Sequence, residues 1–213
     1  MGTTRLELYN GALIELGERT LASLTENREP RRVLDDIWDR DFVDYVLEQG
    51  LWNFAMRTVQ VDYSPSIAPD FGYNRVFDKQ TDYIRTAALA SDEFFQVPLL
   101  EYTDEINYVF ANIDTIYMKY ISNDASFGGD LSIWPATFTR YAELELAKRA
   151  VTRISQSSAD KETLMRDTKK ARIDARSKDA MNEPTKFMPK GSWELARTKG
   201  RDTSHSSIDR SGL

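Results

Sequence analysis

The sequence predicts a mainly α protein: a four-helix bundle with an inserted small antiparallel β-sheet domain and an extended C-terminal arm. Three observations lead to this class. Stretches on both sides of the middle place apolar residues three and four positions apart, the spacing of one helical face. The stretch 56–122 instead alternates and is rich in Tyr, Phe, Val and Ile, which favours strands. Residues 184–213 carry neither pattern and are rich in Pro, Gly and Ser.

These changes of pattern divide the chain into four parts. Residues 1–55 are expected to form the first part of the bundle, residues 56–122 the β insertion, residues 123–183 the second part of the bundle, and residues 184–213 the arm. The length of 213 residues suits one large domain with such an insertion. Three to five antiparallel strands are expected in the insertion, and the pattern does not fix the strand register between residues 64 and 112.

The first helix is predicted over residues 3–16, where apolar residues recur at helical spacing. Thr3 or Thr4 is expected to cap its start, because a hydroxyl at that position accepts a hydrogen bond from a free backbone N–H group. Gly17 marks its end. The short link that follows leads into a second and longer helix.

That second helix is expected to organise the helical half. Its apolar residues form one stripe: Val33, Leu34, Ile37, Trp38, Phe42, Tyr45 and Val46. Pro30 fits the first turn, where its missing N–H group costs nothing. Asn27 or Thr25 is the expected cap, and Gly50 suits a left-handed stop after the last turn.

Three aromatic residues are predicted to anchor the helical core. Trp38 lies on the apolar stripe, and Trp52 and Phe54 follow directly after the stop, placed to fold back onto it. Truncating Trp52 or Phe54 to alanine is expected to cost ~3–5 kcal/mol if both are buried.

Two further helices are predicted near the end of the folded part. Pro135 begins one whose apolar residues cover most of its circumference, so it should be central in the bundle. The last helix, over residues 159–182, is polar with a thin apolar stripe. A helix of this composition either faces solvent or lies against another subunit.

The composition removes several kinds of chemistry. With no cysteine, the chain has no disulfide, no thiol nucleophile and no zinc–thiolate site. The single histidine, His205, is most simply a solvated residue of a Ser-rich tail. No cofactor or metal is expected, and the nucleotide-binding, α/β-hydrolase and zinc-protease motifs are absent. No apolar run is long enough to cross a membrane, and the N-terminus does not resemble a signal peptide.

Aspartates crowd the second helix: Asp35, Asp36, Asp39, Asp41 and Asp44. Paired carboxylates can perform acid–base chemistry, but here arginines lie between them, so an acidic solvated or intersubunit face is the favoured interpretation. The net charge of −6 is also uneven. Residues 1–139 hold 11 Lys and Arg against 23 Asp and Glu (−12), and residues 140–213 hold 17 against 11 (+6). Opposite charges on two halves indicate either a nucleic-acid tail or side-by-side packing of copies, and the many acids within the basic segments weaken the first option.

Several short blocks resemble the head–tail adaptor proteins of tailed bacteriophages, above all the tail tubular protein A group of short-tailed phages. The blocks are Leu8-Tyr9-Asn10-Gly11-Ala12-Leu13, Leu16-Gly17, Leu21-Ala22-Ser23-Leu24, Gly50 followed by Leu51-Trp52-Asn53-Phe54-Ala55, Tyr141 in its Ala- and Leu-rich helix, Ser192-Trp193, and Ala196-Arg197. They occur in the expected order over most of residues 6–197, and the match is weakest at residues 64–112.

The resemblance implies a structural virion protein and not an enzyme. Members form a ring of twelve copies that joins the portal protein to the tail nozzle or tube protein, and DNA is ejected through the channel without specific binding. The expected portal or neighbour interface is the arm, through Phe187, Met188, Trp193, Leu195 and Arg197. Two alternatives stay open: a tail-associated cell-wall glycosidase that uses paired carboxylates, and a DNA-binding module.

Overall fold

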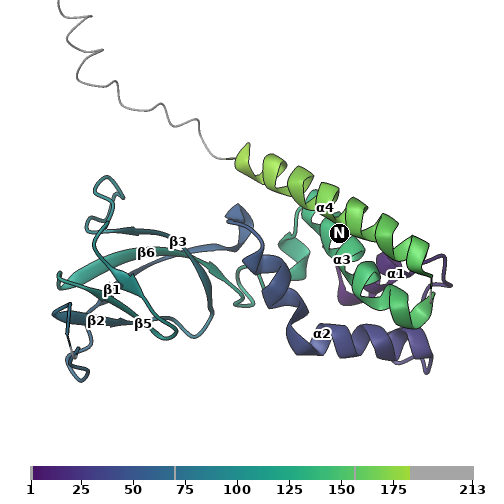
Figure 1. Cartoon of the computed structure of the whole chain (residues 1–213), viewed down its shortest axis with the longest axis horizontal. Coiled ribbons are helices and arrows are strands. Elements are labelled where there is room, and N and C mark those ends of the chain that lie inside the picture. Colours follow the sequence, from purple (N-terminus) through teal and green to yellow (C-terminus); the bar gives the residue numbers. More distant parts are fainter. Residues whose placement is uncertain (1, 70, 156, 183–213) are drawn as a thin grey trace, which may run out of the picture. The chain divides into compact units, whose positions relative to one another are not determined.

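A computed structural model describes residues 2–69, 71–155 and 157–182 of the chain (Figure 1). Its helices are α1 (Arg5–Glu15), α2 (Glu29–Glu48), α3 (Ala136–Ile154) and α4 (Ser158–Ala180), with 3-10 turns η1 (Asn53–Ala55) and η2 (Leu131–Ile133). Its strands are β1 (Met56–Asp62), β2 (Arg75–Asp78), β3 (Tyr83–Ala90), β4 (Thr103–Asp104), β5 (Tyr108–Ala111) and β6 (Thr115–Ser122). The strands all come between η1 and η2 in the sequence.

The predicted fold class is wrong, because the protein is an α/β mixture and not a four-helix bundle with a small inserted sheet. The strands build two three-stranded antiparallel sheets around a core of their own. The helices also depart from a bundle: α3 packs against each of the other three, and α2 is kinked at Asp41 (φ −163°, ψ 15°). The sequence understated the strands because short strands buried by a facing sheet, such as β2, do not alternate.

The two sheets have the orders β1-β6-β3 and β2-β5-β4. In the first sheet Met56 pairs with Ile121 and Asp62 with Thr115, and β3 is irregular where it pairs with β6. The sheets bury a shared set of side chains: Val61, Phe77, Leu89, Val109, Ala111, Ile116, Met118 and Tyr120. Six strands exceed the three to five expected, since β4 is only two residues long and left no signal.

The N-cap of α1 agrees with the sequence prediction, whereas the N-cap of α2 does not. Thr4 caps α1 as expected, since its hydroxyl accepts the N–H of Glu7 at 3.3 Å and Glu7 closes a capping box. The predicted cap of α2 is wrong: Arg28 occupies the N-cap position without a side-chain hydrogen bond. Asn27 instead accepts a hydrogen bond from the Arg32 side chain. Pro30 does lie in the first turn.

Gly50 ends the helical stretch for a different reason than predicted. Its φ is not positive, whereas Gly17 has φ +71°. A Cβ atom at Gly50 would lie 2.8 Å from the Trp52 indole. Glycine is therefore required by the close approach of an aromatic ring, not by a left-handed turn.

Trp52 lies at the centre of an aromatic cluster in the helical core. Its side chain is 1% exposed, and its indole N–H donates to the Val46 carbonyl at 3.2 Å. Its ring centroid is 4.7 Å from that of Phe138 on α3, and Phe54 approaches Phe138 to 4.8 Å. Trp38 and Phe54 are only partly buried, and both pack against this core. Trp52 is thus the predicted anchor that the helical core encloses most completely.

A buried carboxylate ties the strand region together near the helices. Asp82 accepts hydrogen bonds from Arg57 at 2.8 Å, from the Tyr120 hydroxyl at 3.1 Å, and from Ser122. Burial alone would raise the pKa of the Asp82 carboxyl, but the donors outweigh it and hold that pKa below its ordinary value. Beside it, the Arg85 guanidinium donates to the Glu48 carbonyl at the end of α2.

Candidate interaction groove

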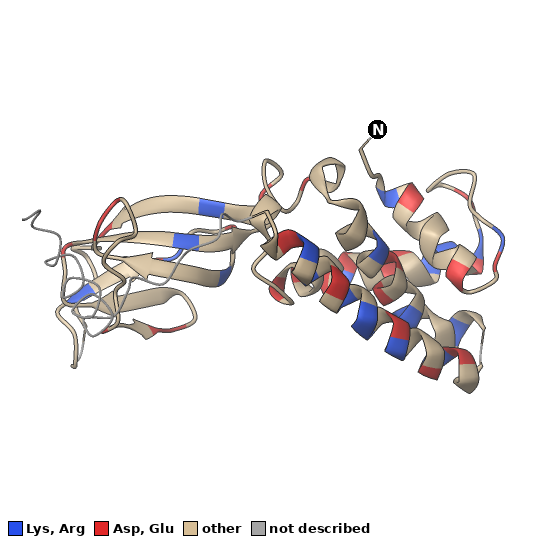
Figure 2. Ribbon diagram, turned by 90° about the horizontal axis from the view of Figure 1, so that it is seen from above, with Lys and Arg blue, Asp and Glu red and all other residues tan. Residues whose placement is uncertain are grey.

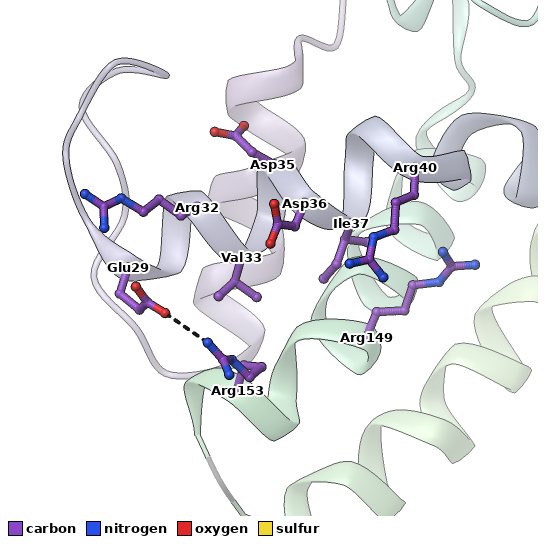
Figure 3. A pocket seen from close by; sticks show the side chains of 9 residues that line it. All are labelled: Glu29, Arg32, Val33, Asp35, Asp36, Ile37, Arg40, Arg149 and Arg153. Carbon is purple, nitrogen blue, oxygen red and sulfur yellow. Dashed lines mark hydrogen bonds and ion pairs between the residues drawn. The ribbon is translucent and has the colours of Figure 1, made fainter.

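An open groove of about 740 Å³ lies between α2 and α3. Figure 3 shows its nine lining side chains, of which seven are charged: Glu29, Arg32, Val33, Asp35, Asp36, Ile37, Arg40, Arg149 and Arg153. The first seven come from α2, and the two remaining arginines come from α3.

Helical spacing explains how these residues meet. Arg32, Asp36 and Arg40 are four positions apart on α2, so they follow one another along one side of that helix. Arg149 and Arg153 are likewise four apart and run along α3 opposite them. The groove therefore presents rows of guanidinium and carboxylate groups from two helices.

Some of these charges are already paired between the helices. Arg153 lies 3.4 Å from Glu29, the pair marked in Figure 3. Arg149 contacts Asp41 at 3.2 Å and the buried Glu145 at 3.1 Å, and its guanidinium lies 4.1 Å from the Tyr45 ring centroid. These pairs hold α2 against α3 and keep Arg149 in a fixed position.

Asp35 is the most heavily engaged carboxylate of the groove. It accepts hydrogen bonds from Arg5 at 2.8 Å and from the Tyr9 hydroxyl at 3.0 Å, and it forms an ion pair with Arg31. Burial raises the pKa of Tyr9, so this hydroxyl keeps its proton and remains a donor to Asp35. The Nε atom of Arg31 is buried without a hydrogen-bond partner in the described part of the chain.

The side chains of Asp36 and Arg40 have no hydrogen bond or ion pair with any other described residue, although they lie in a row of charges. They are therefore available to charged groups of a partner. The lining contains no Ser, Thr, Cys, His, Lys or Tyr. Such a surface suits the recognition of a polar protein segment by ion pairs more than it suits a covalent reaction.

The paired-carboxylate alternative requires an acid whose pKa is raised. Burial raises the pKa of Glu143, with the Arg140 guanidinium opposing the shift. Glu143, however, lies against Gly11 of α1 and is not a lining residue of the groove. The groove carboxylates thus do not include Glu143, the acid of α3 whose pKa burial raises.

Within residues 2–69, 71–155 and 157–182, no cluster of three or more His, Cys, Asp or Glu side chains is arranged to hold a metal ion. None of the helices in these residues combines the length and apolar character that a membrane span requires.

The candidate residues taken from sequence fall into two groups. Trp38, Trp52 and Phe54 pack in or against the helical core and are not lining residues of the groove. The interface residues Phe187, Met188, Trp193, Leu195 and Arg197 lie outside the described residues, as does His205. The sequence showed the α2 arginines Arg32 and Arg40 between the aspartates, but it did not predict that Arg149 and Arg153 of α3 line the same groove.

Exposed apolar side chains form a second notable surface feature. Phe71 is 89% exposed, Leu100 83% and Ile106 91%, all in loops of the strand region. On α4, Met165 and Ile173 are 54% and 55% exposed. Large apolar side chains that gather at a protein surface indicate interaction sites.

A scan of protein-family models found no match to this chain, and a search of curated proteins found none either.

Proposed function

We propose that this protein is a structural assembly protein whose copies join into a ring, and that the ring is the head–tail adaptor of a tailed phage virion. In this role it binds the portal protein on one side and the tail nozzle or tube protein on the other. DNA leaves through the channel without specific binding.

The observation that carries the proposal is a set of large apolar side chains that stay exposed, although the helical region and the strand region each have a buried core. Leu100 and Ile106 are 83% and 91% exposed, although Trp52 and Tyr120 show that this chain buries large side chains fully when a core is available. Assembly would remove the exposed groups from water, which stabilises a complex by ~25 cal/mol per Å² of apolar area. The acidic α2 and the charged groove add contacts that select the partner.

The glycosidase and DNA-binding alternatives gain no specific support. The groove carboxylate Asp35 is held by Arg5 and Tyr9, and the lining residues that α3 contributes opposite α2 are arginines, not acids. The groove arginines are interleaved with Glu29, Asp35 and Asp36, whereas attraction to phosphates needs clustered positive charge.

The test is the mass of the purified protein alone and after mixing with the portal ring of the same phage. The proposal expects a stable complex holding several copies per portal, with no lytic activity on cell walls. The arm is tested by deleting residues 184–213, which should leave a folded chain that no longer joins the portal. Lytic activity lost on replacing one Asp or Glu, or DNA binding that falls steeply with salt, would reject the proposal.

A further inference from the structure

Residues 91–106, here called the acidic ridge, expose most of their side chains. Every residue from Leu100 to Asn107 is exposed, and near the start of the ridge Phe94 and Val97 are 73% and 57% exposed. The ridge therefore exposes large apolar side chains to solvent. Such exposure is typical of a surface that another molecule covers.

The backbone of the ridge is nonetheless fixed. The Asp92 carboxylate accepts the N–H groups of Gln96 at 3.0 Å and Val97 at 2.7 Å. Phe95 adopts φ +55°, and the Lys119 ammonium lies 4.3 Å from its ring centroid. The Leu99 N–H group donates to the Leu89 carbonyl at 2.9 Å. A surface held in shape in this way loses little conformational entropy when it binds.

The ridge is also strongly acidic. It contains five carboxylates and no Lys, Arg or His. The Asp92 carboxylate accepts backbone hydrogen bonds, and Asp104 forms an ion pair with Lys79. The carboxylates of Glu93, Glu101 and Glu105 have no hydrogen bond or ion pair with any other described residue. The ridge therefore calls for a partner that is basic as well as apolar.

Helix α4 has the complementary composition. Its 23 residues, 158–180, hold seven Lys and Arg against five Asp and Glu, in the alternating pattern seen along the long front helix of Figure 2. Its buried side is narrow, with Leu164, Thr168, Ala175 and Asp179. Met165, Lys169 and Ile173 follow one another at four-residue spacing along an exposed side.

Most cationic side chains of α4 are also free. Five have no hydrogen bond or ion pair with any other described residue: Lys161, Lys169, Lys170, Arg176 and Lys178. Because α4 packs on α3 through its narrow buried side and the ridge is exposed, residues 2–69, 71–155 and 157–182 leave both surfaces uncovered.

We infer that the acidic ridge of one copy docks on the exposed side of α4 of a second copy. Glu93, Glu101 and Glu105 meet the free lysines, and the apolar side chains of the ridge cover Met165 and Ile173. Two different surfaces are used, so the contact is heterologous and closes into a ring when its rotation allows. The inference rests on the proposed function and names the surfaces through which copies join.

The absence of cysteine makes a direct test possible. Leu100→Cys and Ile173→Cys are made as separate full-length variants and mixed under mild oxidation. Docking predicts that Leu100→Cys and Ile173→Cys form a disulfide-linked pair at least about tenfold faster than Leu100→Cys and Ile14→Cys do. Ile14 is an exposed apolar position of α1 and therefore serves as the matched control. Equal rates for the two mixtures, or no crosslink in either, overturn the inference.

Charge reversal supplies the second test. Glu101→Lys with Glu105→Lys on the ridge, or Lys169→Glu with Lys170→Glu on α4, should each weaken self-association about tenfold or more. Mixing the two reversed proteins should restore it, because opposite charges face each other again. Arg19→Glu, an exposed reversal in the loop after α1, is the control and should leave association unchanged.

Association is measured by sedimentation velocity on the free chain and on the chain mixed with portal rings. Copies that assemble equally well with either reversal overturn the ridge contact and leave the proposed function intact. A ridge reversal that removes portal binding but not self-association assigns the ridge to the portal and also overturns the inference. Copies that never associate, with or without portal, overturn both.

Discussion

The helical region and the strand region differ in how extensive a core of buried side chains each one forms. The helical region builds an extensive core around α3, in which Trp52, Phe138 and Tyr141 are each about 1% exposed. The strand region encloses a smaller core between two short sheets and carries the long exposed ridge. The comparison indicates that the helices supply most of the stability and that the strand loops supply surface.

The largest effect is expected at the centre of the helical core. Trp52→Ala should lower the free energy of unfolding by ~3–5 kcal/mol, because it leaves a large cavity against Phe138 and removes a hydrogen bond to Val46. Urea unfolding followed by circular dichroism measures the loss. The control Leu51→Ala removes a side chain that is 47% exposed and should cost far less. Similar losses for both variants would contradict the importance of this core.

A smaller effect is expected where the strand region depends on one carboxylate. Asp82→Asn should lower the free energy of unfolding at pH 7 by ~1–3 kcal/mol, because Arg57 and two hydroxyl donors lose their charged acceptor. The pKa of Asp82 is lowered by folding, so its contribution is present above the unfolded value of 3.8 and is lost as pH falls through the lower folded value.

Urea midpoints measured from pH 7 down to pH 2 test the direction of this effect. The natural chain should lose stability below about pH 4, and Asp82→Asn should lose less over the same range. Thr115→Val, which removes an exposed hydrogen bond to Asp62, is a control in the same sheet. Parallel acid profiles for the natural chain and Asp82→Asn would contradict the role assigned to Asp82.

The helical region contains a carboxyl group with the opposite behaviour. Burial raises the pKa of Glu143 above 4.5, with Arg140 opposing it, so its favourable contribution is present below pH 4.5 and is lost as pH rises through the folded value. Glu143→Gln should therefore raise stability slightly at pH 7 and flatten the profile between pH 4 and 7. Thermal unfolding at the two pH values provides the measurement, and an unchanged profile would reject it.

The smallest effect is expected on the acidic ridge. Ile106→Ser should change the free energy of unfolding by less than ~0.5 kcal/mol, because that side chain is 91% exposed. Val109→Ser, at a fully buried position three residues away, is the matched contrast and should unfold the strand region far more easily. A large loss for Ile106→Ser would mean that the ridge supports the fold itself.

Local chemistry made several features predictable from sequence. Thr4 caps α1, Pro30 lies in the first turn of α2, and Pro135 precedes α3, because each depends on neighbouring residues alone. The structure and sequence differ where distant groups decide. The Trp52 ring that leaves no room for a Cβ atom at Gly50 is held by Phe138 of α3, and the Asp82 cluster joins Arg57 to Ser122.

For the same reason, the sequence indicated only the α2 side of the groove. The crowding of charges on α2 was clear, but the matching Arg149 and Arg153 come from a helix more than a hundred residues later. The proportions of helix and strand were misjudged because a two-residue strand such as β4 is defined by its hydrogen-bonded partner, not by its own composition.

The kink at Asp41 divides α2 into two segments with different roles. All the groove residues of α2 precede Asp41, whereas Val46, which accepts the Trp52 hydrogen bond, follows it. Because the backbone angles at Asp41 are not helical, we expect the first segment to open without unwinding the second. Amide hydrogen exchange should therefore be faster before Asp41 than after it, and a partner that occupies the groove should slow exchange in the first segment alone.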